Sequence, residues 1–377
     1  MKGVVYIKFT ILVTQDCNLA CTYCYVNKHP LKMEIDTAEK VVDFIFERAD
    51  RTDKNYIAFF GGEPMLEIEL MKSIVNIIEQ HPSFPEYEVE LSVVSNGTIF
   101  TDEIADFLVE HDITYCLSCD GDAKVQDLSR RFKNGEGSSS TVEATIRSAI
   151  TKLPLVLVNA VYSKETLKSL PDTVRYLVGI GLRQIHINAD YTADWQLEDV
   201  ETLESVYSEI ADIHMESYRS GKPVYISAID GKITILLRDG YQYSERCHMG
   251  KKEFAFSPEG NVFPCERIIE DGKSDNKHCL GNVETGIDLS RLSCNMLGTD
   301  EVNTECLTCE INKYCMHWCG CSNYLSTGYY NRAGAFMCAE QKILIQTAYN
   351  IVETFKKEMP AALANHLSGR MMLNSMM

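Results

Sequence analysis

The chain has 377 residues, of which 45% are apolar and 24% charged, a composition typical of globular proteins and unlike that of disordered or collagen-like ones. Its 36 basic and 54 acidic residues leave a net charge of −18, which argues against binding to nucleic-acid phosphates or to anionic lipid. No apolar run approaches the ~20 residues of a membrane span, and no signal-peptide cleavage site follows the apolar N-terminal stretch. We therefore expect a soluble, cytoplasmic protein of about two to three domains.

The first half of the chain alternates apolar, β-branched segments with segments of helical periodicity. A repeat of about 33 residues is the size of a βα unit with a right-handed crossover, which predicts an α/β fold whose parallel sheet is open or curled into a partial (β/α)6 barrel. Active-site residues in such folds lie just after the strands. The predicted strands are Val4–Thr14, Tyr56–Phe60, Val89–Val94, Tyr115–Ser118, Leu155–Val161 and Gln184–Asn188, and the predicted helices are Thr37–Ala49, Glu67–Glu79, Asp102–Glu110, Thr141–Ile150 and Leu167–Val178.

The second half is predicted to be less regular. Leu197–Arg219 has the periodicity of a long helix, and the segment after it has the character of a linker with a short helix around Lys232–Leu237. Helical periodicity returns only at Ala339–Phe355. The predicted divisions are a first domain at 1–225, a linker at 226–246, a cysteine-rich domain at 247–340, and a C-terminal helix with a frayed tail at 341–377.

The chain has 15 cysteines, which is many for a protein expected to stay in a reducing compartment. A chain of this length does not need disulfides to stabilise its core, and an odd total leaves at least one thiol unpaired in any disulfide scheme. Ten of the cysteines lie between Cys247 and Cys338, where regular periodicity is weak. Because bound metal stabilises such irregular segments, we interpret the cysteines as metal ligands.

Three cysteines, Cys17, Cys21 and Cys24, follow the first predicted strand with the spacing Cys-x3-Cys-x2-Cys. Three thiolates from one loop can hold one metal centre and leave a coordination position open, as catalytic sites do. An iron–sulfur cluster ordinarily has four cysteine ligands, so a cluster held here would offer one iron to a substrate or cofactor. The alternative is a zinc loop with a fourth ligand such as His29.

The segment CNLACTYC resembles the signature of radical S-adenosylmethionine (SAM) enzymes, including the aromatic Tyr23 before the last cysteine. This resemblance implies a [4Fe–4S] cluster whose open iron chelates the amino and carboxylate groups of SAM. It also implies reductive cleavage of SAM to a 5′-deoxyadenosyl radical, which abstracts a hydrogen atom from the substrate. Such an enzyme needs an electron donor such as flavodoxin or ferredoxin.

Polar motifs also stand at the ends of the next predicted strands. In Gly61-Gly62-Glu63, the glycines would let the backbone approach a ligand closely and Glu63 could accept from an ammonium, although the same motif could be an ordinary turn. The family resemblance implies that Glu63 binds the methionine amino group of SAM. It further implies that SAM is contacted by residues at the ends of the next two strands and beyond. These are the pair Ser95 and Asn96, then Ser118, and finally Arg130 or the adjacent Arg131.

The later cysteines resemble the seven-cysteine SPASM extension of radical SAM enzymes that modify peptides and proteins. The resemblance implies two auxiliary [4Fe–4S] clusters, and hence three clusters in all; two zinc sites are the alternative. The outer auxiliary cluster would be held by Cys306, Cys309, Cys315 and Cys338, and the inner one, nearer the active site, by Cys247, Cys265 and Cys319. The inner cluster either keeps an open iron that could bind a substrate thiolate, or recruits a fourth ligand from Cys279, Cys294 and Cys321.

Glu266 directly follows Cys265, at the place where anaerobic sulfatase-maturating enzymes carry an aspartate proposed as a base. Glu266 could act as a base or simply pair with Arg267. Two differences argue against sulfatase maturation: a glutamate replaces the aspartate, and this chain lacks the extra cysteine that those enzymes carry between the positions of Cys247 and Cys265. The segment Phe-Phe-Gly-Gly-Glu-Pro also resembles the form found in peptide maturases. We therefore predict a radical SAM oxidoreductase that installs a thioether or carbon–carbon cross-link in a ribosomally made peptide. The alternatives are formylglycine generation on a sulfatase and a zinc-bound interaction protein that is not an enzyme.

The expected partner is a peptide or protein substrate, and neither nucleic acid nor a membrane is expected. The first cysteine motif begins at residue 17, which leaves no room before it for an N-terminal leader-binding domain. A peptide would then be held by the core or delivered by a separate leader-binding protein. The net charge of −18 favours a neutral or basic leader.

Overall fold

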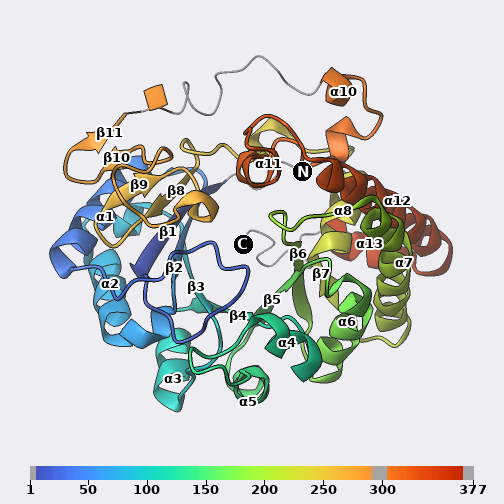
Figure 1. Ribbon diagram of the computed structural model, residues 1–377, viewed down its shortest axis with the longest axis horizontal. Helices are drawn as coiled ribbons and strands as arrows, with labels where there is room; N and C mark the ends of the chain where they lie inside the picture. Colours follow the sequence, from blue (N-terminus) through green and yellow to red (C-terminus); the bar gives the residue numbers. More distant parts are fainter. Residues whose placement is uncertain (1–5, 289, 292–303, 368–377) are drawn as a thin grey trace. The chain divides into compact units, whose positions relative to one another are not determined.

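The computed structural model describes residues 6–288, 290–291 and 304–367 (Figure 1). Cys294 and the predicted tail after Ser368 lie outside these residues. The chain divides into two compact units. Of the described residues, the first contains those at 6–118, 129–155 and 247–291, and the second contains those at 119–128, 156–246 and 304–367.

The first unit is built on a sheet with β1 near its middle. Strands β1 (Tyr6–Thr14), β2 (Lys54–Gly61), β3 (Val89–Ser95) and β4 (Ile113–Ser118) run parallel in that order. On the other side of β1 the later part of the chain adds β8 (Glu253–Phe256) in parallel, then β9 (Asn261–Phe263), β10 (Gly281–Asn282) and β11 (Gly286–Ile287) antiparallel (Figure 1). Residues from the cysteine-rich segment therefore lie beside the first strand of the chain.

The core of this unit explains the placement of β1. Phe9 is fully buried, pairs with Ile57 in β2 and with Phe254 in β8, and its ring stacks 6.0 Å from that of Phe254. Helix α1 (Ile35–Arg48) buries its apolar face and sets Phe44 edge-on against Phe254. A strand that is apolar on both faces is typical of the interior of a parallel sheet. The other helices of this unit are α2 (Ile68–Gln80), α3 (Asp102–Glu110) and α5 (Ser139–Lys152).

The second unit has three parallel strands, β5 (Val156–Tyr162), β6 (Gln184–Ala189) and β7 (Tyr225–Ile226). Its long helix α12 (Ala335–Glu358) packs along α7 (Leu197–Arg219) and α8 (Ser227–Leu237) (Figure 1). The remaining helices are α4 (Ala123–Ser129), α6 (Leu170–Gly179), α10 (Thr304–Leu307), α11 (Gly320–Thr327) and α13 (Pro360–Leu367).

A buried histidine–aspartate–histidine group joins three of these helices. Oδ1 of Asp230 in α8 lies 3.0 Å from Nε2 of His214 in α7 and 2.7 Å from Nε2 of His366 in α13. The other oxygen of Asp230 accepts from the Ile226 backbone N–H at 2.6 Å. The carboxylate therefore fixes α13 against the rest of this unit.

The predicted α/β class with a parallel sheet is confirmed, and the predicted helices at 102–110 and 197–219 have the observed bounds. The segment at 226–246 was predicted as a linker with a short helix around Lys232–Leu237. The observed helix α8 is longer, beginning at Ser227, and Ile229, Ile233 and Ile235 are buried in it. The other predicted domain boundaries stay a prediction.

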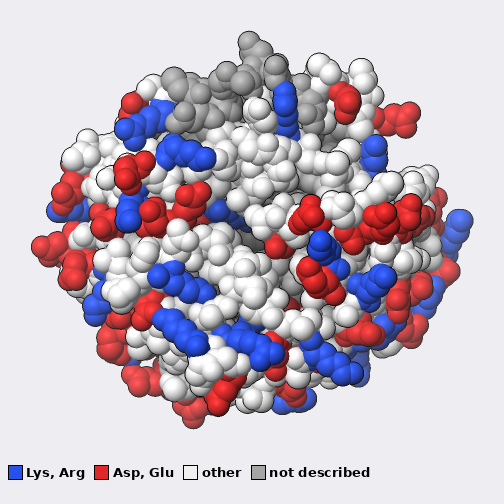
Figure 2. Space-filling view, viewed as in Figure 1, with Lys and Arg blue, Asp and Glu red and all other residues white. Residues whose placement is uncertain are grey.

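Acidic and basic side chains are interspersed over the face shown in Figure 2. None of the helices in the described part of the chain is long and apolar enough to cross a membrane.

Candidate active site

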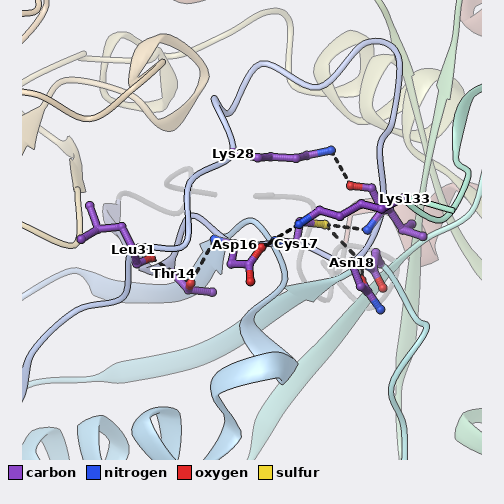
Figure 3. A network of polar contacts seen from close by, with 9 residues as sticks. Thr14, Asp16, Cys17, Asn18, Lys28, Leu31 and Lys133 are labelled. Carbon is purple, nitrogen blue, oxygen red and sulfur yellow. Dashed lines mark hydrogen bonds and ion pairs between the residues drawn. The ribbon is translucent and has the colours of Figure 1, made fainter.

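The loop that carries the first cysteines is fixed to the end of β1. Thr14 Oγ1 donates to the Leu31 carbonyl at 2.9 Å and accepts from the Asp16 N–H at 3.0 Å. Asp16 in turn accepts from the Cys17 N–H at 2.8 Å and pairs with Lys133 at 2.9 Å (Figure 3). The strand end thus orients Cys17 before any metal is bound.

The three cysteines of this loop differ in exposure. Cys17 is 4% exposed, Cys21 is half-buried and Cys24 is exposed, and the described cysteines form no disulfides. The sulfur of Cys17 accepts from the Leu19 N–H at 3.4 Å and from the Asn96 side-chain amide at 3.6 Å. Burial raises the pKa of Cys17 to about 11. The metal-free chain therefore holds this sulfur as a thiol, which must lose its proton when metal binds.

Gly61 and Gly62 make a close backbone contact, and their predicted approach to a ligand stays a prediction. A Cβ at Gly61 would lie 2.0 Å from the Thr14 carbonyl oxygen, and one at Gly62 would lie 1.9 Å from that of Asp16. Gly61 also has a φ of +130°, which side chains rarely allow. The Gly62 and Glu63 N–H groups donate to these same two carbonyls at 2.8 Å each. The glycine pair therefore clamps the end of β2 onto the cysteine loop.

Glu63 is completely buried at the end of β2. Its carboxylate accepts from Ser95 Oγ at 2.9 Å, from the Asn96 N–H at 2.6 Å and from the Met65 N–H at 3.0 Å. Burial raises the pKa of Glu63 to about 7, while these hydrogen bonds and the charge of Arg130 favour the ionised form. The group is a buried carboxylate poised to meet a cation.

Asn96 connects this carboxylate to the cysteine loop. Its backbone N–H binds Glu63, while its side-chain amide binds Cys17 and also donates to Asn18 Oδ1 at 2.8 Å. Ser95 and Asn96 therefore order the site in this structure, and their predicted ribose contacts stay a prediction. Ser118, also predicted to contact SAM, is the buried last residue of β4.

Arg130 and Arg131 point to different surroundings. The Arg130 guanidinium lies 5.2 Å from the centre of the Tyr23 ring, within cation–π range, and the residue is buried. The exposed Arg131 instead donates to the Gly135 carbonyl at 3.0 Å. The geometry favours Arg130 over Arg131 as the cation of the site.

Glu266 belongs to a buried charge cluster in the first unit. Lys8 Nζ of β1 lies 3.1 Å from Glu266 and 3.4 Å from Glu253 of β8. The thiols of Cys247 and Cys265 donate to Glu253 and Glu266 at 3.3 and 3.6 Å. Each of these two predicted ligands therefore lies beside a carboxylate that pairs with the same ammonium.

The charge of Lys8 determines the ionisation of Glu266. Burial alone would raise the pKa of Glu266, but the Lys8 ammonium lowers it below its usual value. Lys8 lies at hydrogen-bonding distance from Glu266, and the charge of Arg267, the partner that the sequence suggested, also lowers the pKa of Glu266. A carboxylate with a lowered pKa is a weaker proton acceptor, and the predicted role of Glu266 as a base stays a prediction.

The cysteines of the second unit gather near α11 and α12. Burial raises the pKa of Cys315, the Lys232 ammonium opposes this, and the Cys338 and Cys306 thiols add to the rise, so both thiols lie within electrostatic range of Cys315. The Cys309 N–H donates to the Cys306 carbonyl at 3.3 Å in a tight turn. Cys319 begins α11, and its sulfur lies 3.7 Å from that of Cys321.

The three candidates for a fourth inner ligand have different surroundings. Cys279 is packed in an apolar cluster with Leu12 and Phe263 in the first unit, whereas Cys321 lies beside Cys319 in the second. Cys294 lies outside the described residues.

Residues 11–177 match the model of the Radical SAM superfamily. These residues are a radical SAM domain. The predicted enzyme class is thereby confirmed: the chain is an enzyme that cleaves SAM reductively, and its cofactors are SAM and a [4Fe–4S] cluster. The zinc-bound interaction protein considered above is not supported.

Relatives of the radical SAM enzyme include sulfatase maturases. The chain is 25% identical to a cysteine-type anaerobic sulfatase-maturating enzyme of Clostridium perfringens over 335 residues, covering 80% of this chain and 85% of that one. It shares its fold with anSMEcpe solved with bound AdoMet, with a TM-score of 0.80, 20% identity and coverage of 97% and 99%. It is also similar in fold to Streptococcus suis SuiB bound to the precursor peptide SuiA, with a TM-score of 0.60, 14% identity and coverage of 89% and 76%.

The residues at the ends of β1 and β2 fit the cofactors of a radical SAM domain. The loop after β1 presents the three cysteines, and the buried sulfur of Cys17 accepts hydrogen bonds from N–H groups, as cluster sulfurs do. The buried carboxylate of Glu63 and the buried guanidinium of Arg130 lie in the same unit. They match an amino-acid ligand, whose ammonium needs an anion and whose carboxylate needs a cation.

The sequence did not predict Lys8 and Glu253, although a lysine inside an apolar strand is a recognisable signal of a buried ion pair.

Proposed function

We propose that this enzyme is a peptide maturase that installs a thioether or carbon–carbon cross-link in a ribosomally made peptide or a protein. In the proposal Cys17, Cys21 and Cys24 hold the SAM-binding cluster, and Glu63 and Arg130 bind the methionine part of SAM. The observation that carries it is the connection through Asn96, which hydrogen-bonds Cys17 with its side chain and Glu63 with its backbone. A cluster ligand and an ammonium acceptor are thus held on either side of a single residue.

The chain's own groups prepare this site for an amino-acid ligand. When bound, the cluster supplies the electron for the reductive cleavage of SAM. Three donors bind the Glu63 carboxylate and favour its ionised form against burial, and in that form it can accept from the SAM ammonium. The Arg130 side chain, held over Tyr23, supplies the cation for the carboxylate.

A peptide substrate is supported by a structure of similar fold, SuiB with its precursor peptide. Formylglycine generation is the second candidate, because a sulfatase-maturating enzyme is similar over most of both chains. The pairing of Glu266 with Lys8 argues for the cross-link, since an ion-paired carboxylate with a lowered pKa is a weak base. The electron donor of the reaction would be a flavodoxin or ferredoxin.

We further propose two auxiliary [4Fe–4S] clusters, which bring the total to three. The electrostatic interaction of the Cys306 and Cys338 thiols with Cys315 supports the outer cluster, with Cys309 completing the set. The shared charge cluster of Cys247 and Cys265 supports these two as ligands of the inner cluster, to which the proposal adds Cys319.

The type of product tests the proposal. The reconstituted enzyme is incubated anaerobically with SAM, dithionite and synthetic cysteine-containing peptides whose flanks are neutral or basic. By mass spectrometry we expect a product peptide that is lighter by two hydrogen atoms and that does not react with a hydrazide probe for aldehydes. A hydrazide-reactive product would contradict the proposed cross-link and indicate formylglycine formation.

A further inference from the structure

A buried lysine lies beside the outer cysteines, and the site described above does not use it. Lys232 of α8 is 4% exposed. Its ammonium donates to the Tyr314 carbonyl at 3.0 Å and to Gln341 Oε1 at 2.6 Å, and it lies 5.4 Å from the centre of the Tyr241 ring. All four residues belong to the second unit, so the arrangement is internal to that unit.

Among the described residues, no carboxylate lies within ion-pair distance of the Lys232 ammonium. Its two hydrogen-bond acceptors are a carbonyl and an amide oxygen, and both are neutral. Glu340, the nearest acidic neighbour in sequence to Gln341, uses its two oxygens to accept from Tyr162 at 2.6 Å and Tyr191 at 2.7 Å. Burial lowers the pKa of Lys232 to about 8, while the charges of Cys315 and Glu340 oppose this shift. A buried ammonium without an ion-pair partner is costly unless something anionic binds near it.

Both acceptors of Lys232 hold the chain on either side of Cys315. Tyr314 is the residue before this cysteine, and Gln341 Oε1 also accepts from the N–H of Met316, the residue after it, at 3.3 Å. The Cys315 thiol itself lies within electrostatic range of Cys306 and Cys338. Lys232 is therefore a buried cation fixed to the segment that presents the central thiol of the outer set.

We propose that Lys232 is the counter-cation of the outer auxiliary cluster and sets its reduction potential. The inference rests on the proposed function, because it requires a [4Fe–4S] cluster at Cys306, Cys309, Cys315 and Cys338. Four thiolates give such a cluster a net negative charge that increases on reduction. A buried cation beside it stabilises the reduced form more than the oxidised form and so raises the potential.

The variant Lys232→Met removes the charge and keeps the length of the side chain. Lys232→Arg keeps the charge, and Lys313→Met is the matched control, because Lys313 is an adjacent but half-exposed lysine paired with Asp239. Each full chain is loaded with iron and sulfide anaerobically, and its clusters are followed by EPR during a redox titration. The signal that disappears in Cys309→Ala identifies the outer cluster.

At a fixed potential we expect Lys232→Met to lower the ratio of reduced to oxidised outer cluster at least tenfold, which is about 59 mV for a one-electron couple. A unit charge within about 10 Å gives this size of effect at an effective dielectric constant of about 20. Lys232→Arg and Lys313→Met should titrate close to the wild type. An unchanged potential in a fully loaded Lys232→Met chain would overturn the inference and leave the proposed function intact. If Cys309→Ala lost neither iron nor an EPR signal, the proposed outer cluster would fail, and the inference with it.

Melting temperatures cover the case in which Lys232→Met loads too little iron for a titration. The counter-cation role predicts that this substitution lowers the melting temperature of the loaded chain more than that of the iron-free chain. An equal loss in both forms would mean that Lys232 only supports the fold, and would overturn the inference.

Discussion

Removing the charge of Lys8 should destabilise the first unit of the iron-free chain. Lys8 forms ion pairs of 3.1 and 3.4 Å with Glu266 and Glu253, and all three side chains are at most 18% exposed. Coulomb's law at an effective dielectric constant of about 20 gives an attraction of about 5 kcal/mol for each pair before desolvation is counted. Breaking a buried pair by removing one partner costs about 3–5 kcal/mol, and the partial exposure here places Lys8→Met near about 3 kcal/mol.

Urea unfolding of the iron-free chain, followed by circular dichroism, measures this loss. Lys54→Met is the matched control, because Lys54 is also a strand lysine that pairs with two glutamates but is one-third exposed, and its loss should stay below about 1 kcal/mol. The Lys8→Met defect should shrink as the pH falls from about 8 to about 5, because carboxylates without their ammonium take up protons more readily. In a Glu253→Gln/Glu266→Gln background the same substitution should cost less than about 1 kcal/mol. An equal loss in both backgrounds would refute the electrostatic account and assign the effect to packing of the lysine stem.

Three further outcomes are expected. Glu63→Gln should weaken SAM binding to the loaded enzyme by about 1.5–3 kcal/mol. The SAM affinity of the wild type should rise as the pH rises through about 7, because Glu63 ionises there. Equal SAM affinities of the two proteins in calorimetry would contradict this. Hydrogen bonding to Asp230 outweighs burial and raises the pKa of His366, so this contribution to stability is complete below about pH 6.5 and is lost as the pH rises through the raised value. The melting temperature of the wild type should therefore fall over that range, and Asp230→Asn should be less stable and lack this part of the fall; a parallel pH profile for the two proteins would show that the pair does not titrate. Cys309→Ala should lose about four irons per chain and melt at a lower temperature, since cluster binding is coupled to folding, whereas a stable variant with full iron would exclude Cys309 as a ligand.

The repeating strand–helix units could be predicted from the sequence because their signals are local. Six apolar strands and the helices between them, except for the short α4, were found close to their observed places, and the strand-end rule located Cys17 and Glu63 at neighbouring strand ends. Only the second half of helix α8 was predicted, because the helix contains a glycine and is apolar around most of its surface, so it shows no amphipathic period. The packing of α8 against α12 and β6 explains its helical structure.

Contacts between distant parts of the chain could not be predicted in this way. Strand β8 has only four residues, and its pairing with β1 is what brings Glu253 to Lys8. The glycines at 61 and 62 were correctly marked as positions of close approach, but their partner is the backbone of Thr14 and Asp16. A single sequence shows that a side chain is missing there and does not show what fills the space.

The central claim is that the loop at the end of β1 holds the cluster that cleaves SAM. The most direct test is anaerobic reconstitution of the wild type and of the Cys17→Ala/Cys21→Ala/Cys24→Ala variant, followed by iron counting and a 5′-deoxyadenosine assay with SAM and dithionite. The account predicts about twelve irons and 5′-deoxyadenosine for the wild type, and about eight irons and no nucleoside for the variant. Undiminished 5′-deoxyadenosine from the triple variant would contradict it.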